Sequence, residues 1–142
     1  MRILGLDLGT KTLGVSVSDN TETIASFIGT IRFKENEYET SFSELEKIIN
    51  DYSVKEIVLG LPKNMNNTSG EAVERSLRFK DMLINKFKLP VFFQDERLTS
   101  VTANKILLEA DTSRKKRKKK VDALAATIIL QNYLDIRKGQ RK

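Results

Sequence analysis

The sequence predicts an α/β fold in which three antiparallel strands come first and strand–helix units follow. Two segments with strand patterns, residues 2–8 and 13–18, are separated by only four residues, which favours a hairpin. A third segment rich in β-forming residues lies within 23–33. Beyond residue 40, strand-like runs alternate with helical periodicity, which is typical of parallel strands joined by right-handed crossovers. We therefore expect a mixed five-stranded sheet flanked by helices.

The second half of the predicted fold begins with a helix. Ser43 followed by Glu46 is the spacing of a capping box, and Leu45, Ile48, Ile49 and Tyr52 share one helical face. The later elements follow from apolar runs and turn residues. They are a strand at 56–60, a loop at 63–70, a helix at 70–87, a strand at 90–94, a helix that Thr99 caps, and a final helix at about 121–136.

Composition limits the chemistry available to this chain. Its 142 residues are typical of one domain, 1–142, and no apolar run approaches the 18 residues of a membrane span. There are no cysteines and no histidines, so disulfides, thiolate metal sites and histidine general bases are excluded. If the protein is an enzyme, carboxylates and a hard cation are the leading candidates.

Positive charge is concentrated at the C-terminal end. Residues 1–113 carry a net charge of −3 and residues 114–142 carry +9, which together give the net +6. We expect a basic loop at 112–120 and a basic tail at 137–142, with the loop contacting nucleic-acid phosphates. The alternative is a loop that is only solvated and contacts no nucleic acid. The loop contains seven consecutive cations, which we call the basic run: Arg114, Lys115, Lys116, Arg117, Lys118, Lys119 and Lys120.

Asp7 stands out because it lies in the run 3–9, which otherwise reads as a buried strand. Desolvating an unpaired carboxylate costs several kcal/mol, so a metal, a cation or hydrogen-bond donors must offset the cost. Gly5, Gly9 and Gly14 leave space for a ligand or another backbone nearby. An aspartate that only caps a turn is the alternative.

Further carboxylates are expected near the same edge of the sheet. Asp95 and Glu96 follow the last strand, and Asp122 opens the final helix, where small alanines allow close packing against the sheet. A divalent cation such as Mg²⁺ would remove the repulsion among such acids and could promote phosphodiester cleavage. Two simpler readings remain open: Asp122 as a favourable helix N-terminal acid, and Glu96 as the partner of Arg97.

Four sequence blocks together resemble the YqgF (RuvX) family of Holliday junction resolvases, over nearly the whole chain. The Asp95–Ser100 block and the alanine-rich helix are the more specific pair. The blocks are Asp7-Leu8-Gly9-Thr10-Lys11-Thr12-Leu13-Gly14 continuing to Asp19, Gly60-Leu61-Pro62 with Asn64-Met65 and Gly70, Asp95-Glu96-Arg97-Leu98-Thr99-Ser100, and Asp122-Ala123-Leu124-Ala125-Ala126 with Ile129-Leu130-Gln131.

The resemblance implies an RNase H-like fold and a bacterial cytoplasmic nuclease that uses Mg²⁺ or Mn²⁺. Asp7, Glu96 and Asp122 would be the catalytic, metal-binding acids, and Asp95 an accessory acid. The substrate would be the 5′ end of precursor 16S ribosomal RNA, branched DNA, or both. Lys11, Arg97 and the basic run would bind the nucleic acid. Thr12 departs from the family, which often has Arg there, so Lys11 is the only cation of its turn.

Two other functions are compatible with parts of the sequence. The Asp-x-Gly-Thr turn also resembles the phosphate loop of sugar kinases and actin-like ATPases, but those enzymes enclose their nucleotide with two domains. A nucleic-acid-binding ribosome-assembly factor without catalysis would explain the basic run alone. The sequence leaves open whether the substrate is RNA or DNA, and whether the protein is a monomer or a homodimer.

Overall fold

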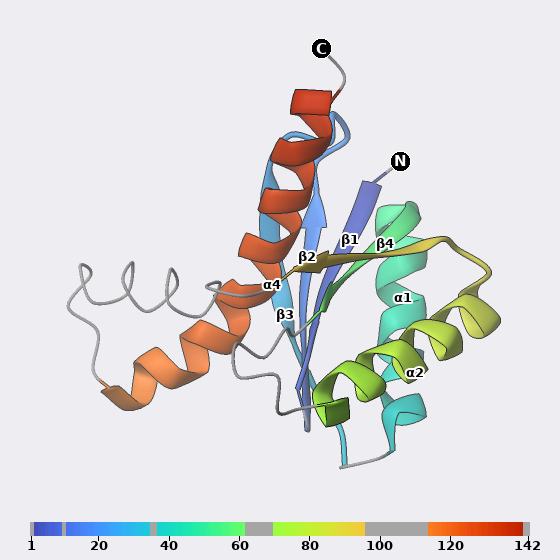
Figure 1. The fold of residues 1–142 in the computed structure, drawn as a ribbon, viewed down its shortest axis with the longest axis vertical. Coiled ribbons are helices and arrows are strands. Elements are labelled where there is room, and N and C mark those ends of the chain that lie inside the picture. The colour runs from blue at the N-terminus through green and yellow to red at the C-terminus, as the bar shows by residue number, and fades with distance from the viewer. Residues whose placement is uncertain (1, 10, 35–36, 62–69, 96–113, 141–142) are drawn as a thin grey trace.

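The structure, a computed structural model, describes residues 2–9, 11–34, 37–61, 70–95 and 114–140. These residues form one five-stranded sheet with helices on both faces (Figure 1). The predicted fold class, a mixed sheet of three antiparallel and two parallel strands, is confirmed. No helix in these ranges is long and apolar enough to cross a membrane.

The strand order in the sheet is β3-β2-β1-β4-β5. β1 (Arg2–Leu8) pairs antiparallel with β2 (Thr12–Ser18), and β2 pairs antiparallel with β3 (Ala25–Arg32). β4 (Val54–Leu61) and β5 (Val91–Asp95) continue the sheet in parallel on the other side of β1. The carboxyl ends of β1, β4 and β5 therefore meet at one edge, where ligands bind in open α/β sheets.

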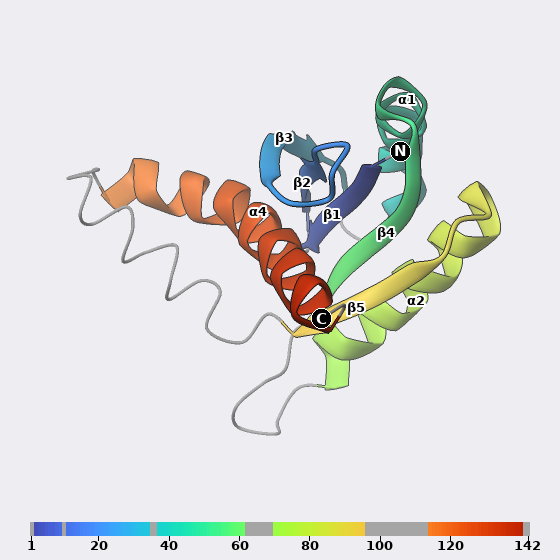
Figure 2. The same cartoon turned by 90° about the horizontal axis from the view of Figure 1, so that it is seen from above.

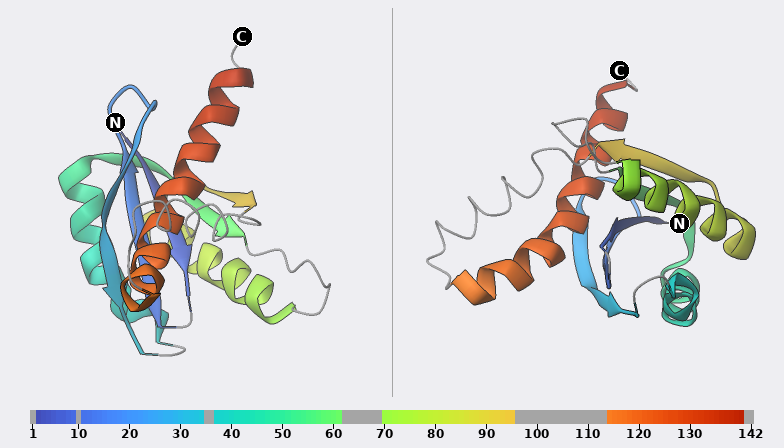
Figure 3. Two further views of the ribbon diagram at one scale, coloured as in Figure 1. Left: turned by 90° about the vertical axis from the view of Figure 1, so that its left-hand side faces the viewer. Right: turned by 60° about the horizontal axis from the view of Figure 1, so that its bottom comes forward.

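Two apolar cores cover the two faces of the sheet. α1 (Phe42–Tyr52) and α2 (Gly70–Phe87) pack on one face, where Leu6, Leu45 and Phe79 belong to the larger core. α4 (Arg114–Gln140) packs on the opposite face, where Ile3 and Leu130 belong to the smaller one (Figures 2 and 3). This separation assigns each strand residue to a face, because successive side chains alternate.

The start of α1 differs from the predicted capping box. A 3₁₀ turn, η1 (Tyr38–Ser41), runs directly into the helix, and Ser41 takes the N-cap position without a side-chain cap. The Ser41 hydroxyl instead donates a hydrogen bond to the Tyr38 carbonyl oxygen, across 2.7 Å. Ser43 lies inside the helix, so its predicted capping role is wrong. The preceding turn supplies the entry into the helix that a capping box would otherwise provide.

The last helix is longer than predicted. α4 begins at Arg114, so residues 114–120 are helical and the expected basic loop is wrong for them. The basic C-terminal tail is likewise helical as far as Gln140. Lysine and arginine are good helix formers, whereas like-charge pairs one turn apart cost only about 0.2–0.5 kcal/mol each. Asp122 consequently lies within α4 and not at its N-terminus, which removes the simple reading of a helix-terminal acid.

Several predicted elements lie outside the described residues. They are the loop after Leu61, the helix that Thr99 caps, and the Glu96-Arg97 pair. The predicted strands at 56–60 and 90–94 correspond to β4 and β5, and the predicted helix at 70–87 matches α2.

Candidate active site at the carboxyl edge of the sheet

Asp7 lies near the end of β1, on the face of the sheet that α4 covers. Its Cα partner on β2 is Gly14, in a ladder that remains regular through Leu8 and Leu13. Leu6 and Leu8 pack with the core on the opposite face, so Asp7 shares its face with Ile3 and Gly5. Asp7 is half-buried. A carboxylate in this position is accessible to a ligand and partly removed from water.

α4 crosses β1 at Gly5. A Cβ atom on Gly5 would lie 2.6 Å from the Leu130 Cβ atom and 3.2 Å from the Ala126 carbonyl oxygen. The buried Ser16 hydroxyl donates a hydrogen bond to that same oxygen, across 2.8 Å. Ala125 and Ala126 are buried, as expected for small residues that let the helix approach the sheet. The glycine and the serine thus fix the distance between the helix and strands β1 and β2.

The direction of α4 along the sheet follows from a second set of hydrogen bonds, made by Gln131. Gln131 accepts a hydrogen bond from the Ala25 amide and donates one to the Thr23 carbonyl oxygen, both across 2.9 Å. Ala25 pairs with Ser18, whose hydroxyl accepts from the Ile3 amide. Residue 131 of α4 therefore lies level with residue 3 of β1, and residue 126 of α4 lies level with residue 5 of β1.

Following α4 further toward its N-terminus leads to Asp122, and following β1 further toward its C-terminus leads to Asp7. Asp122 lies one helical turn before Ala126, about 6 Å along the axis, and Asp7 lies two residues beyond Gly5, about 7 Å along the strand. The backbones of the two aspartates therefore approach one another at the same edge of the sheet. The side chain of Asp122 is outside the described part of the structure.

Asp95 brings the backbone of a third acid to this edge. It ends β5 and pairs with Leu61, while Leu6 of β1 pairs with Leu59 of β4. Strand spacings of about 4.8 Å put β5 about 10 Å from β1. Glu96, the next residue, and Arg97 lie outside the described residues. The structure therefore brings three of the four predicted acids to one edge by their backbones.

The donor set expected here suits a hard divalent cation. Carboxylate oxygens are the ligands that Mg²⁺ and Mn²⁺ prefer, and the chain has no Cys or His to favour a softer metal. Among the residues whose side chains are described, no cluster of three acidic residues is close enough to hold a metal. Those residues include Asp7 but not the side chains of Glu96 or Asp122.

The predicted nucleic-acid-binding cations that the structure describes lie on two segments. Lys11 is exposed in the turn between β1 and β2. The basic run forms the first turns of α4, which extend past β3 and away from the sheet (Figure 2). Cations at a helix N-terminus oppose the helix dipole. A polyanion bound along this part of α4 would relieve that unfavourable term.

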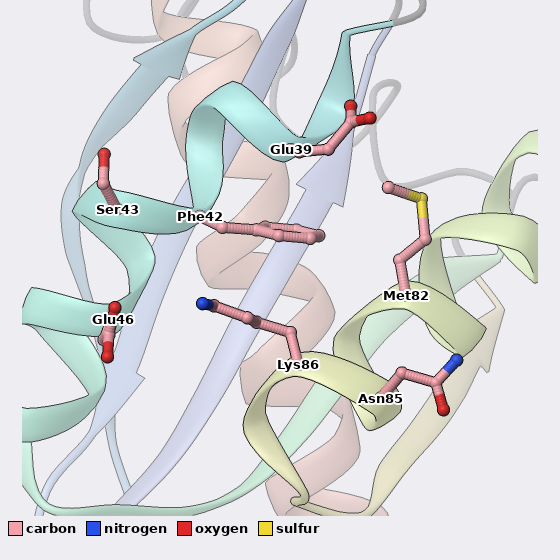
Figure 4. Close-up of a pocket in the computed structure, with 7 residues that line it drawn as sticks. All are labelled: Glu39, Phe42, Ser43, Glu46, Met82, Asn85 and Lys86. Carbon is pink, nitrogen blue, oxygen red and sulfur yellow. The ribbon is translucent and has the colours of Figure 1, made fainter.

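A hollow lies on the other face of the sheet, away from Asp7. It has a volume of about 600 Å³ and lies between α1 and α2 (Figure 4). Phe42 and Met82 form its apolar wall, and Lys86 extends into the gap between the helices. Because it faces away from Asp7 across the sheet, we assign it no part in the chemistry of that edge.

Glu56 is a buried carboxylate that sequence reasoning missed. Like Asp7, it lies in an apolar strand, and only 6% of its surface is exposed. It forms an ion pair with Arg137 of α4 and accepts a hydrogen bond from the Tyr133 hydroxyl, across 3.5 Å. Burial, together with the charge of Glu56, raises the pKa of Tyr133. The pattern that singled out Asp7 could have found Glu56, but not its partner 81 positions away.

Solved structures show what class of fold this is. RuvC from Thermus thermophilus, in complex with a Holliday junction substrate, superposes with a TM-score of 0.59 at 15% identity, covering 98% of this chain and 96% of that one. A second Thermus thermophilus RuvC structure gives a TM-score of 0.56 at 14% identity, covering 98% and 97%. The chain therefore has the RNase H-like fold of RuvC, as predicted.

Sequence relatives identify the family. Residues 1–136 match the family described as "RuvX: Holliday junction resolvase", and the chain belongs to this family. A relative from Oenococcus oeni, named "Putative pre-16S rRNA nuclease", is 54% identical over 141 residues, 99% of this chain and 97% of the relative. The Bacillus subtilis relative of the same name is 52% identical, covering 95% and 98%.

Proposed function

We propose that this protein is a divalent-metal-dependent nuclease that hydrolyses phosphodiester bonds at the edge carrying Asp7. The observation that carries the proposal is the approach of Asp122, on α4, toward Asp7, on β1, although 115 positions separate them in sequence. Membership of the RuvX family supports the same reaction class.

In this proposal, Asp7, Glu96 and Asp122 bind the cation, and Asp95 is an accessory acid. Mg²⁺ or Mn²⁺ supplies charge neutralisation, activation of water and stabilisation of the leaving oxygen. The three carboxylates would hold the cation at the sheet edge, and Gly5 and Ser16 set the height of α4 above the sheet. Asp7 is partly removed from water, which strengthens its electrostatic interactions.

The substrate that we propose is nucleic acid, either the 5′ end of precursor 16S ribosomal RNA or branched DNA. The names of the relatives favour the RNA, and the description of the family favours the DNA. Lys11, Arg97 and the basic run would bind phosphates along the substrate. We place the activity in the cytoplasm, in a single domain that acts as a monomer or a homodimer.

A cleavage assay tests the proposal. Purified protein is incubated with a precursor 16S 5′ RNA, a single-stranded RNA and a four-way DNA junction, each with Mg²⁺, Mn²⁺ or a chelator. We expect metal-dependent cleavage of at least one substrate. Asp7→Asn is expected to abolish cleavage while leaving nucleic-acid binding intact, because it removes a ligand charge without adding bulk.

Asp51→Asn is the matched control, since Asp51 is exposed on α1, which packs on the opposite face of the sheet. It should cleave as the parent does. If the parent protein binds these substrates but cuts none of them with either metal, a binding role in ribosome assembly replaces the nuclease. Equal loss of cleavage in both variants would argue against a specific role for Asp7.

A further inference from the structure

Arg32, the last residue of β3, faces the same side of the sheet as Asp7. Its neighbours Ile31 and Phe33 are both buried in the core beneath α1 and α2, whereas Arg32 is exposed. Because strand side chains alternate, Arg32 lies on the face that α4 covers. This is the face on which Asp7 lies.

The strand register connects the two residues. Asp7 pairs with Gly14, and Gly14 pairs with Thr30 on β3. Two residues further along, Thr12 pairs with Arg32. Two strand spacings of about 4.8 Å and a two-residue offset of about 7 Å separate the Cα atoms of Asp7 and Arg32 by about 12 Å.

Two backbone hydrogen bonds hold this register at the hairpin end. The Gly9 amide donates to the Thr12 carbonyl oxygen across 2.8 Å, which closes the turn between β1 and β2. The Phe33 amide donates to the Lys11 carbonyl oxygen across 2.9 Å, which ties the same turn to the end of β3. The exposed Lys11 and Arg32 are therefore held on neighbouring segments.

No residue in the described part of the chain accounts for Arg32 as a structural partner. Among the described residues, its guanidinium forms no ion pair, hydrogen bond or ring contact. A guanidinium presents a planar fork of donors that fits two phosphate oxygens at once. Thr12, directly opposite Arg32, can make no such contact, and Lys11 supplies only a point charge.

We infer that Arg32 forms a subsite for a backbone phosphate of the nucleic-acid strand, flanking the phosphate that is cleaved beside Asp7, and that the exposed Lys11 on the adjoining turn adds positive charge nearby. Arg32 supplies from β3 the bidentate contact that Thr12 cannot supply from β2. A nucleic-acid strand rises about 3.4 Å per nucleotide when stacked, so the two phosphates lie within about four nucleotides of each other. The inference rests on the proposed nuclease function only where it places a cleaved phosphate beside Asp7. The phosphate contact of Arg32 does not depend on that function.

Binding measurements in the non-cleaving Asp7→Asn background test this inference. Fluorescence anisotropy is recorded for labelled RNA and DNA oligonucleotides of one sequence over a range of salt concentrations. Arg32→Gln should weaken binding of both about tenfold and reduce the slope of log affinity against log salt by about 0.7. The affinity of Arg32→Lys should lie between those of the Asp7→Asn parent and Arg32→Gln. Lysine keeps the positive charge but lacks the planar fork of donors. Thr12→Arg combined with Arg32→Gln should restore affinity, because residue 12 then carries the guanidinium on the same face.

Arg78→Gln is the matched control, since Arg78 is exposed on α2 across the sheet. It should leave affinity and salt slope unchanged, and thermal melting should show that every variant is folded. Unchanged affinity of Arg32→Gln at all salt concentrations would overturn the inference, as would an equal loss in Arg78→Gln. Since no cleavage is measured, these results are readable whether or not the nuclease proposal holds.

Discussion

Gly5 of β1 and Leu130 of α4 lie so close together that a methyl group on Gly5 would be 2.6 Å from the Leu130 Cβ atom. No rotation of the leucine side chain can relieve this overlap, because a Cβ atom is fixed to the helix backbone. The close approach therefore sets the distance at which α4 crosses β1. Through α4 it also sets the position of Asp122 relative to Asp7.

Gly5→Ala should destabilise the protein by about 1–3 kcal/mol, the usual cost of adding a methyl group to a packed core. It should also lower cleavage of the substrate, because α4 must move away from β1 and carry Asp122 with it. Chemical denaturation and the cleavage assay measure the two effects.

Gly29→Ala is the control for this substitution. Gly29 lies on β3, where an added Cβ would meet nothing within 4 Å. Its effects on stability and cleavage should both be small. If Gly5→Ala behaves like Gly29→Ala in both measurements, the helix position does not depend on Gly5.

Arg137→Met should destabilise the protein by roughly 1–3 kcal/mol. Breaking a buried ion pair costs about 3–5 kcal/mol, and we expect less here because 31% of the Arg137 side chain is exposed. The cost arises because Glu56 is left buried without its partner. Adding Glu56→Gln to Arg137→Met should therefore recover part of the loss, as measured by urea denaturation. A double variant less stable than Arg137→Met would contradict this account.

Asp19 should make stability depend on pH in acid. The Thr21 hydroxyl, followed by the Thr23 and Ile24 amides, donates to its carboxylate and lowers its pKa from 3.8 to about 2. The ionised form is thus favoured in the folded state, so its stabilisation is present above pH 4 and is lost as pH falls toward 2. The stability difference between the parent and Asp19→Asn should shrink across this range.

Denaturation curves at a series of pH values measure that difference. Asp51→Asn is the comparison, because Asp51 is exposed and has no hydrogen-bond partner among the described residues. A difference for Asp19→Asn that stays constant from pH 4 to pH 2 would show that the turn does not hold the charged carboxylate.

Replacing the seven cations of the basic run, 114–120, by glutamine should weaken nucleic-acid binding and flatten its salt dependence. The salt slope should fall by about 0.7 for every phosphate of a single strand that the protein no longer neutralises, and by about 0.9 for a duplex. Circular dichroism should show that helix content is kept, because glutamine is also a good helix former and no longer opposes the dipole. The control replaces Lys47, Arg78 and Lys86, which are exposed on α1 and α2. An unaltered salt slope would identify the basic run as a solvated helix end.

Much of the fold was predictable because strand and helix periodicities are local. The alternation along 13–18 and the helical spacing across 70–87 depend only on neighbouring residues, and the strand and the helix appear there, the strand with one more residue at its start. The start of α1 was not predictable, since Ser41 and η1 together displaced the capping box at Ser43. The basic run was also misjudged, because helix propensity outweighed charge repulsion.

The sequence by itself determined the fold class, the absence of cysteine and histidine chemistry and the family resemblance, because these depend on composition and on short blocks of residues. The tertiary structure alone decided which distant residues meet: Gly5 with Leu130, Glu56 with Arg137, and Thr12 with Arg32. Such pairings depend on strand register and on the height of α4 above the sheet, and both are set by packing across the whole molecule.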